Sequence, residues 1–251
     1  MKVFLTGASS GIGEELARHY SRRGAVLGLV ARRADLLEAL KASLPAGAET
    51  YPCDVRDLPA LKAAAADFVS RHGAPDLVIG NAGVSHGTVT EIAEDVATFR
   101  EILDINVIGL VNTFHPFIEP MRARGGGRLV GIASVAGFRG LPGASAYSAS
   151  KAAAISYLEA LRLELRRSRI AVTTICPGFI ATPMTAKNPY PMPFLLEAGE
   201  AARRIARAID AGRTYAIIPW QMAIVGRILR VLPNAIYDRL MRGAGRKPRK
   251  S

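Results

Sequence analysis

Short runs of apolar, often β-branched residues alternate along this chain with longer stretches in which apolar residues recur every three or four positions. The first pattern is typical of buried strands and the second of amphipathic helices. Regular alternation of the two predicts repeated β-α units, whose strands run parallel because each helix returns the chain to the same edge of the sheet. We expect strands near 3–6, 26–31, 49–54, 77–81, 128–134, 171–176 and 215–219, with helices that include 12–23, 35–44, 58–72 and 146–167.

This pattern predicts an α/β fold: a doubly wound, seven-stranded parallel sheet between two helical layers. Right-handed crossovers then place a ligand crevice at the carboxyl ends of the strands. The chain has 251 residues, of which 49% are apolar, so it can bury a large core. Because no linker or internal repeat divides it, we expect residues 1–219 to form one domain that carries the site and residues 220–251 to form an extension of it.

Three glycines follow the first expected strand. Residues 6–13 read Thr-Gly-Ala-Ser-Ser-Gly-Ile-Gly and lead into a helical pattern. Glycine removes the Cβ atoms that would hold the backbone away from a pyrophosphate, and amides at a helix start can then face the anion. The spacing differs from the commoner Gly-x-Gly-x-x-Gly fingerprint. We interpret the turn as a cradle for a dinucleotide, with a tight connection that binds nothing as the alternative.

The end of the second expected strand indicates which dinucleotide is bound. An acidic residue there would accept a hydrogen bond from the ribose 2′-hydroxyl of NAD, whereas arginine accommodates the extra phosphate of NADP. This chain has Arg32 and Arg33, with no carboxylate before Asp35. NADP(H) is therefore favoured over NAD(H). The alternative is that both arginines are solvated at a helix start, where cations are mildly unfavourable.

Further short motifs follow in order: Cys53-Asp54-Val55, Asn81-Ala82-Gly83, Leu-Asp-Ile-Asn-Val at 103–107, Gly-Ile-Ala-Ser at 131–134, Tyr-Ser-Ala-Ser-Lys at 147–151 and Pro-Gly-Phe-Ile-Ala-Thr at 177–182. Together with the glycine turn, this series resembles that of the short-chain dehydrogenase/reductase superfamily over nearly the whole chain. The resemblance implies a Rossmann-like domain with strand order 3-2-1-4-5-6-7. It also implies an NAD(P)-dependent enzyme that acts on CH–OH donors.

The resemblance, read with the glycine turn and the two arginines, gives the expected site residues. For the cofactor these are Gly7, Ser9, Ser10, Gly11, Ile12, Gly13, Arg32, Arg33, Asp54, Val55, Asn81, Ala82, Gly83, Tyr147, Lys151, Pro177, Gly178, Ile180 and Thr182. For catalysis they are Asn106, Ser134, Tyr147 and Lys151.

The chemistry of the catalytic set can be read from the residues themselves. Tyr147 and Lys151 are four positions apart and share one face of a helix. A nearby ammonium favours the phenolate, which makes tyrosine a usable acid and base. Ser134, at a strand end, is placed to hydrogen-bond the substrate oxygen. The resemblance adds that Lys151 holds the nicotinamide ribose and that Asn106 supports a water relay to Lys151. The expected reaction moves a hydride between nicotinamide and a carbonyl or secondary alcohol.

Each of these residues also has a structural interpretation. Tyr147 can pack in a helix, Lys151 can be solvated, Ser134 can cap a turn, and Asn106 can be a satisfied core amide. Thr182 can contact the cofactor or start a turn before Pro183. The alternative function is a non-catalytic NADP(H)-binding sensor or interaction protein.

Other classes of protein are disfavoured. The four histidines have no metal-ligand spacing, so no metal is expected, and Ser134 lacks the Gly-x-Ser-x-Gly elbow of a hydrolase. Cys53 and Cys176 lie in apolar stretches and are expected to be free thiols. With neither a signal-peptide core nor a membrane-spanning run, a cytoplasmic location is expected.

The net charge of +12 is concentrated near the carboxyl end, where residues 213–251 contain nine Lys or Arg and one Asp. Because the basic residues do not spread over the chain with interleaved aromatics, no specific nucleic-acid partner is expected. Residues 220–232 form an amphipathic pattern that Pro233 interrupts, a shorter one follows at 236–241, and 242–250 are strongly basic. This extension can be a subunit interface, a flap over the pocket or a peripheral membrane contact. The last few residues are expected to be disordered.

The segment 184–197, rich in proline and apolar residues, follows the sixth expected strand. Substrate selection in the family resembled resides there, so we expect a lid over an apolar, lipid- or steroid-like carbonyl or alcohol substrate, or else a loop that packs on its own domain. The resemblance also implies a homodimer or homotetramer.

Overall fold

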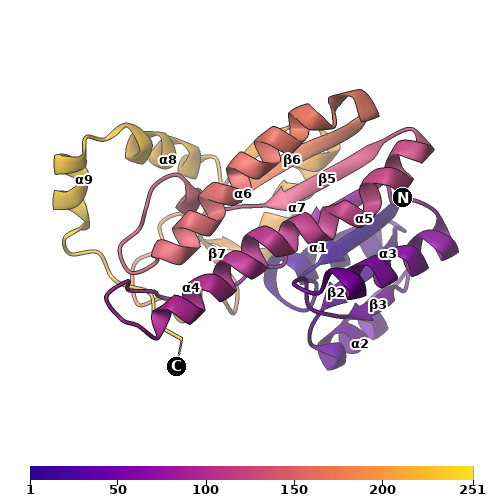
Figure 1. The fold of residues 1–251 in the computed structure, drawn as a ribbon, viewed down its shortest axis with the longest axis horizontal. Coiled ribbons are helices and arrows are strands. Elements are labelled where there is room, and N and C mark those ends of the chain that lie inside the picture. The colour runs from indigo at the N-terminus through magenta and orange to yellow at the C-terminus, as the bar shows by residue number, and fades with distance from the viewer. Residues whose placement is uncertain (251) are drawn as a thin grey trace.

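Seven parallel strands form the central sheet of the computed structural model, which describes residues 1–250 (Figure 1). They are β1 (Lys2–Thr6), β2 (Val26–Ala31), β3 (Glu49–Pro52), β4 (Leu77–Gly80), β5 (Gly127–Ile132), β6 (Ile170–Pro177) and β9 (Tyr215–Ile218). Their order is β3-β2-β1-β4-β5-β6-β9, which confirms the expected topology. The seventh strand is β9 because two short strands, β7 (Ile180–Ala181) and β8 (Leu196–Glu197), pair with each other before it.

Helices cover both faces of the sheet (Figure 1). They are α1 (Gly11–Arg22), α2 (Ala34–Ser43), α3 (Leu58–His72), α4 (Asp95–Leu103), α5 (Gly109–Arg124), α6 (Ser145–Glu164) and α7 (Ala198–Asp210). A hydrophobic core lies on each face of the sheet. The helices α1, α2 and α7 pack on one face, and α3, α5 and α6 pack on the other. The expected helix at 146–167 is shorter, since a separate 3-10 turn occupies Arg166–Ser168. The structure is therefore the three-layered α/β/α arrangement that the alternating pattern predicts.

The strand β1 shows how the pleat builds these two cores. Phe4 and Leu5 point to opposite faces of the sheet, and both are fully buried. Leu5 belongs to the core beneath α1 and α7, whereas Phe4 packs against Phe117 and Phe68 with ring centroids 4.6 and 5.5 Å away. The first strand of a doubly wound sheet is expected to be buried on both faces, as β1 is.

The carboxyl-terminal extension consists of two helices and a docked tail. Helices α8 (Gln221–Val231) and α9 (Asn234–Met241) are separated at Pro233, as the sequence pattern indicates. They pack beside the loop that follows β5, where Arg139 donates to the carbonyls of Leu229 and Leu232 at 2.6 Å each. Across the described residues, no helix is both long and apolar enough to cross a bilayer.

The expectation of a disordered tail is wrong for the residues up to 250. Residues 242–250 run back across the molecule, so that the chain ends close to the start of α4 (Figure 1). The amide of Gly87 donates to the carbonyl of Pro248 at 2.7 Å, and Arg249 pairs with the buried carboxylate of Asp95. Backbone pairing and a largely buried ion pair hold the tail, a tertiary effect that the local composition does not reveal. Ser251 lies outside the described residues.

Candidate active site

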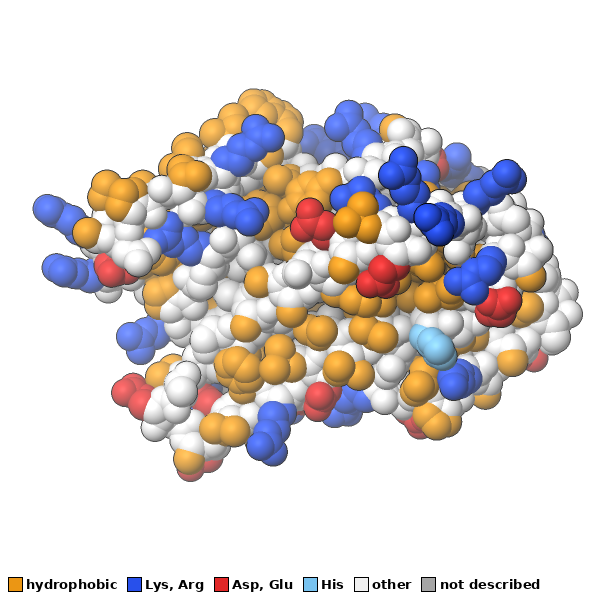
Figure 2. Space-filling view, turned by 45° about the horizontal axis from the view of Figure 1, so that its top comes forward, with side chains coloured by type: hydrophobic (Ala, Val, Ile, Leu, Met, Phe, Trp, Pro, Cys, Tyr) orange, Lys and Arg blue, Asp and Glu red, His pale blue; other side chains and the backbone are white. Residues whose placement is uncertain are grey.

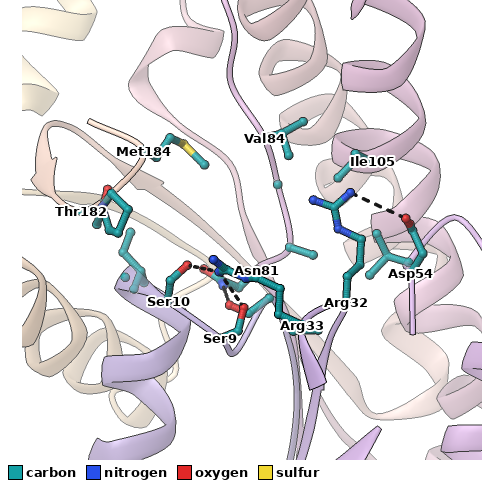
Figure 3. Close-up of a pocket in the computed structure, with 18 of the residues that line it drawn as sticks. Ser9, Ser10, Arg32, Arg33, Asp54, Asn81, Val84, Ile105, Thr182 and Met184 are labelled. Carbon is teal, nitrogen blue, oxygen red and sulfur yellow. Dashed lines mark hydrogen bonds and ion pairs between the residues drawn. The ribbon is translucent and has the colours of Figure 1, made fainter. Parts of the chain in front are cut away.

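Two adjoining hollows lie at the carboxyl ends of the parallel strands. The first, drawn in Figure 3, extends from the glycine turn to the end of β3; among the expected residues it is lined by Gly7, Ser9, Ser10, Gly11, Ile12, Arg32, Arg33, Asp54, Val55, Asn81, Ala82, Gly83 and Thr182. The second contains Ser134, Tyr147, Lys151, Pro177, Gly178 and Ile180. Ile12, Asn81, Gly83 and Thr182 line both, so the two hollows form one continuous cleft.

The glycine turn requires its glycines for two different reasons. Gly7 and Gly11 have φ values of 70° and 59°, which side chains rarely adopt. Gly13 does not line the cleft; a Cβ there would lie 2.1 Å from the carbonyl oxygen of Gly7. Its role is therefore close packing behind the turn. Asn81 fixes the turn from β4, because its side-chain amide donates to the carbonyls of Thr6 and Gly7 at 3.2 and 3.0 Å.

The two arginines at the end of β2 face different parts of the first hollow. Arg33 donates to the hydroxyls of Ser9 and Ser10 at 2.9 and 3.2 Å, while Arg32 reaches towards Asp54 at 3.9 Å (Figure 3). The hydrogen bond from Arg56, at 2.7 Å, holds the pKa of Asp54 below its usual value. This donor set, two guanidiniums and two serine hydroxyls at the start of α1, has the chemistry that binds phosphate. The residues present therefore fit a phosphorylated dinucleotide.

The second hollow brings together the three side chains expected to do chemistry. Tyr147 lies in the first turn of α6, Lys151 lies one turn later, and Ser134 follows β5. The ammonium nitrogen of Lys151 lies 5.8 Å from the centre of the Tyr147 ring. The i, i+4 spacing thus places both groups on one face of the helix, directed into the same space.

Lys151 is almost completely buried and donates to the carbonyl of Ile132, at the end of β5, at 2.9 Å. Burial lowers the pKa of this ammonium from its usual 10.5 to about 8. The structural interpretation, a solvated helix lysine, is therefore excluded. A lysine held in this way is a rigid donor with a proton that it can release near neutral pH.

Tyr147 is a partly exposed phenol whose pKa is raised by burial, an effect that the neighbouring Ser134 hydroxyl opposes. Ser134 is buried; its Oγ accepts from the amide of Ala136 at 3.1 Å and lies 3.4 Å from the carbonyl of Pro177. Ser134 thus caps a turn and also faces the cleft, so its two interpretations are compatible. In this environment Tyr147 holds its proton and can donate it to an oxygen that enters the hollow.

Asn106 lies behind the cleft and lines neither hollow. It sits in a π-helical segment, Asp104–Ile108, between α4 and α5, a local irregularity that is frequent at functional sites. Its amide oxygen accepts from the Val84 amide at 2.8 Å, and its nitrogen donates to the Val84 carbonyl at 3.0 Å and to Ser150 at 2.9 Å. It therefore ties the loop after β4 to α6 at the residue next to Lys151.

The loop after β6 closes the cleft from the other side. Thr182 lines both hollows and also starts a turn, since the amide of Thr185 donates to its carbonyl at 3.0 Å. Both interpretations of this residue therefore hold. The sequence analysis missed several lining residues that carry no chemical signature: Ala31, Cys53, Val84, Ile105, Ile132, Ala133, Pro183, Met184 and Thr185. Cys53, Ile105, Ile132 and Ala133 lie inside the quoted motifs, and Ala31, Val84 and Pro183 lie beside them, so these positions could have indicated a place in the cleft.

Free thiols and groups of possible metal ligands are the remaining candidates for chemistry. Both cysteines are free, and burial raises the pKa of Cys176 to about 11, so this thiol is unreactive at neutral pH. Among residues 1–250, no group of three His, Cys, Asp or Glu side chains is placed to hold a metal ion.

Comparison with known proteins identifies the class. The family model described as short chain dehydrogenase matches residues 1–191, and the chain belongs to this family. It is 39% identical to an uncharacterized oxidoreductase of Myxococcus xanthus, over 94% of each chain. It is 34% identical to a putative ketoacyl reductase of Streptomyces coelicolor, over 91% of this chain and 94% of the other. It is also 35% identical to the 11-beta-hydroxysteroid dehydrogenase-like 2 protein of Arabidopsis thaliana, over 93% of this chain and 78% of the other.

Comparison with solved structures leads to the same family. A short chain dehydrogenase from Burkholderia cenocepacia in complex with NADP superimposes with a TM-score of 0.83, at 25% identity and over 96% of this chain and 97% of the other. The protein is therefore a short-chain dehydrogenase/reductase enzyme, an oxidoreductase whose Rossmann-like fold binds a nicotinamide cofactor.

Proposed function

We propose that this enzyme transfers a hydride between NADP(H) and a carbonyl or secondary alcohol of an apolar substrate. The observation that carries the proposal is the continuity of the cleft: Tyr147, Lys151 and Ser134 line one end, and Arg32 and Arg33 line the other. The NADP complex of the Burkholderia cenocepacia structure supports the choice of cofactor. The alternative, a sensor that binds NADP(H) without turnover, would not need the tyrosine and lysine in the same hollow.

The residues divide the work of cofactor binding along the cleft. The turn from Gly7 to Gly13 and the hydroxyls of Ser9 and Ser10 hold the pyrophosphate, and Arg32 and Arg33 hold the phosphate on the adenosine ribose. Asp54 and Val55 border the adenine, and the loop from Pro177 to Thr182 borders the nicotinamide. When bound, the nicotinamide supplies or accepts the hydride at the reacting carbon.

The protein residues handle the proton. In the direction of reduction, Tyr147 donates its hydroxyl proton to the substrate oxygen, on which negative charge develops as the carbon is reduced. Ser134 donates a hydrogen bond to the same oxygen and fixes its position. Lys151 stabilises the resulting phenolate, holds the ribose and passes a proton back to Tyr147; Asn106 keeps the loop at Val84 in place for a water relay to Lys151. In the direction of oxidation the same groups act in reverse.

The test of the acid and base role is Tyr147→Phe. Removal of one hydroxyl should reduce NADPH-dependent reduction of a carbonyl panel by at least about 100-fold, the usual contribution of a general acid. Binding of NADPH, followed by fluorescence, should change by less than about twofold. Tyr157→Phe, on the same helix but outside the cleft, is the matched control and should keep full activity. Unchanged turnover in Tyr147→Phe would refute the assignment, and a wild type that binds NADPH but reduces no carbonyl would favour the sensor.

The test of cofactor preference uses Arg32→Ala and Arg33→Ala, each assayed with NADPH and NADH. Loss of a charge-assisted contact to phosphate costs about 1.5–3 kcal/mol, so the Kd for NADPH should rise by roughly tenfold or more while that for NADH stays constant. Arg213→Ala, at an exposed position beyond α7, controls for the loss of one positive charge. Equal effects on both cofactors would show that the phosphate is bound elsewhere.

The substrate class rests on the loop between β7 and β8. Its residues Met184, Phe194 and Leu195 are between 39 and 47% exposed, an apolar surface at the edge of the cleft. We infer a lid that closes over an apolar, lipid- or steroid-like substrate. The names of the relatives, a putative ketoacyl reductase and a hydroxysteroid dehydrogenase-like protein, support the same class. A screen of long-chain and steroid ketones that follows NADPH absorbance tests it.

We further propose that the outer face of α8 and α9 rests on the surface of an anionic membrane on its cytoplasmic side. Figure 2 shows apolar and basic side chains interspersed at this end of the molecule. The exposed apolar residues are Trp220, Ile224, Ile228, Val231, Ile236 and Leu240. Arg227, Arg230, Arg239 and Arg242 accompany them. A symmetric dimer through this face would set its arginines against one another, whereas anionic headgroups would neutralise them.

Trp220 is the one tryptophan of the chain, so its fluorescence reports this contact directly. Vesicles that contain phosphatidylglycerol should shift its emission to the blue and sediment with the protein, and pure phosphatidylcholine should do neither. Val231→Asp, at a position 79% exposed, should abolish both effects without a change in fold. Concentration-dependent dimerisation that Val231→Asp abolishes, with no response to vesicles, would instead identify the face as a subunit interface.

The homo-oligomer expected from the family is assigned to a different face. Val96 of α4, Ile108 of the π-helical segment and Leu163 of α6 are each about half exposed, and α4 packs against α6. We propose that these helices form the contact between subunits, which light scattering on wild type and Leu163→Lys would test. A monomeric wild type would refute it.

A further inference from the structure

The last residues of the chain form a strap across the substrate side of the cleft. Three loops contact it, at Gly87, Gly143 and Tyr190. A Cβ built on Gly87 would lie 2.2 Å from the carbonyl oxygen of Lys247, and one on Gly143 would lie 2.9 Å from the side chain of Arg246. A Cβ on Gly245 would lie 2.8 Å from Tyr190, a residue of the expected substrate lid. The strap, residues 242–250, thus touches the loop after β4, the loop before α6 and the lid.

Two ion pairs fix the end of the strap. Arg249 donates to both carboxylate oxygens of Asp95 at 3.0 Å, and the Asp95 side chain is only 5% exposed. The same carboxylate accepts from the amide of Val89 at 2.8 Å. Lys250 pairs with Glu101 on α4. The charges of Arg249 and Lys250 are therefore compensated by carboxylates, and the strap is attached firmly enough to shape the cleft.

Lys247 is different, because it is directed at the reacting phenol. Its ammonium nitrogen lies 5.7 Å from the centre of the Tyr147 ring, the same distance within 0.1 Å as that of Lys151. Among residues 1–250, no carboxylate forms an ion pair with Lys247. Burial lowers the pKa of Lys247 to about 8, so it remains mostly charged at pH 7. A partly buried ammonium without a counter-ion is costly, and an anionic ligand would offset that cost.

Lys247 is one of several positive charges that act on His86. Burial lowers the pKa of His86, in the loop after β4, and the positive charges of Lys250, Lys247 and Lys187 lower it further. Glu101 opposes this effect but is already paired with Lys250. Beside His86 and Tyr147 the structure therefore combines the apolar lid with two ammonium groups, Lys187 and Lys247, and a positive potential there would attract an anion.

We infer that Lys247 is a specificity residue that binds a carboxylate of the substrate, so that the natural substrate is an oxo or hydroxy acid with an apolar chain. This inference rests on the proposed function and narrows its substrate class. The acid group pairs with Lys247 while the carbonyl oxygen a few bonds away meets Tyr147 and Ser134, and the chain lies under the lid. The carboxyl-terminal strap thus completes the substrate site that residues 1–219 begin.

The experiment compares acids with their neutral esters: 4-oxododecanoate and 5-oxododecanoate against the two methyl esters, with NADPH. In the wild type, kcat/KM for at least one acid should exceed that for its ester by tenfold or more. In Lys247→Met the preference should fall to within about twofold, through a higher KM for the acid, while kcat/KM for the ester stays constant. Lys62→Met removes the same charge from an exposed position of α3 and should keep the preference.

A binding experiment separates this inference from the proposed function. Dodecanoate, which cannot be reduced, should bind to the enzyme saturated with NADP+ in calorimetry, and Lys247→Met should weaken its binding by about tenfold. Equal use of acids and esters, or dodecanoate binding unaffected by Lys247→Met, would overturn the role of Lys247 and leave the proposed function standing. Failure to bind NADP+ would instead refute the proposed function. A contact between Lys247 and the Tyr147 ring that only attaches the strap would lower the activity on acid and ester alike.

Discussion

The buried ammonium of Lys151 shows that a residue proposed to act in catalysis can oppose folding. Lys151 is 5% exposed, and among residues 1–250 its one hydrogen-bond partner is a neutral carbonyl, that of Ile132. Its pKa falls from 10.5 to about 8, and a difference of one pKa unit is worth about 1.4 kcal/mol, so charging this group costs the folded state about 3 kcal/mol. In the proposed mechanism this cost is offset by the placement of a proton donor beside Tyr147.

The sign of the pH dependence follows from this shift. Below pH 8 the lysine is charged in both the folded and the unfolded states, and the whole cost is present. As the pH rises from 8 to 10.5, the folded state binds fewer protons than the unfolded state, so the cost disappears. Lys151→Met has no such group. The free energy of unfolding of the variant minus that of the wild type should therefore fall by about 3 kcal/mol between pH 7 and pH 10.5.

Urea unfolding at several pH values measures this difference, and other titrating groups cancel because both proteins contain them. Lys62→Met, at an exposed position of α3, is the control and should give a flat difference. A flat difference for Lys151→Met as well would show that the ammonium is solvated in the folded protein. The same variant should lose most of its turnover.

At the scale of elements, the turn between β1 and α1 depends on the close approach of two backbone segments, which a side chain at Gly13 would prevent. A Cβ at Gly13 would collide with the Gly7 carbonyl at 2.1 Å, and backbone cannot yield as the end of a side chain can. Gly13→Ala should therefore destabilise the protein by about 1–3 kcal/mol, the usual cost of overpacking, and displace the turn that holds the pyrophosphate. Thermal unfolding and the Kd for NADPH should both show the change.

Gly140→Ala is the matched control, because a Cβ there meets nothing within 4 Å. It should leave the melting temperature and the affinity for NADPH as they are in the wild type. A Gly13→Ala protein with normal stability and normal affinity would show that the turn can shift, and the packing argument would be wrong.

The strands and helices also show how much of the fold can be predicted from the sequence. The apolar runs placed all seven strands of the sheet, because a strand buried on both faces has a composition that turns and helices lack. The π-helical segment around Asn106 and the short pair of β7 and β8 carry no such periodicity, and they were not expected. Tyr147, Lys151 and Ser134 were located by motif. Lys247 was not, since only the folded tail brings it to Tyr147, about 100 positions away in the sequence.

At the scale of the whole molecule, part of the positive charge lies at the places where anionic ligands are proposed to bind. The chain carries a net charge of +12, and the structure places arginines at the adenosine end of the cleft, lysines at the substrate mouth and arginines beside the apolar face of α8 and α9. Acidic partners neutralise other cations, as Asp95 does for Arg249. Part of the excess positive charge therefore lies where phosphates, carboxylates and lipid headgroups are proposed to bind.

Cofactor binding should in turn be measurable as stability of the whole fold, because the glycine turn, the end of β2 and the loop after β6 all contact one ligand. A ligand at 100 times its Kd stabilises the folded state by about 2.7 kcal/mol, which for a chain of this size raises the melting temperature by roughly 5–10 °C. NADPH should give this shift at concentrations at which NADH gives a much smaller one. High salt should narrow the gap, because it screens the exposed Arg32 and Arg33. In the double variant Arg32→Ala/Arg33→Ala the two cofactors should give equal shifts; equal shifts already in the wild type would mean that these arginines bind solvent and not the phosphate.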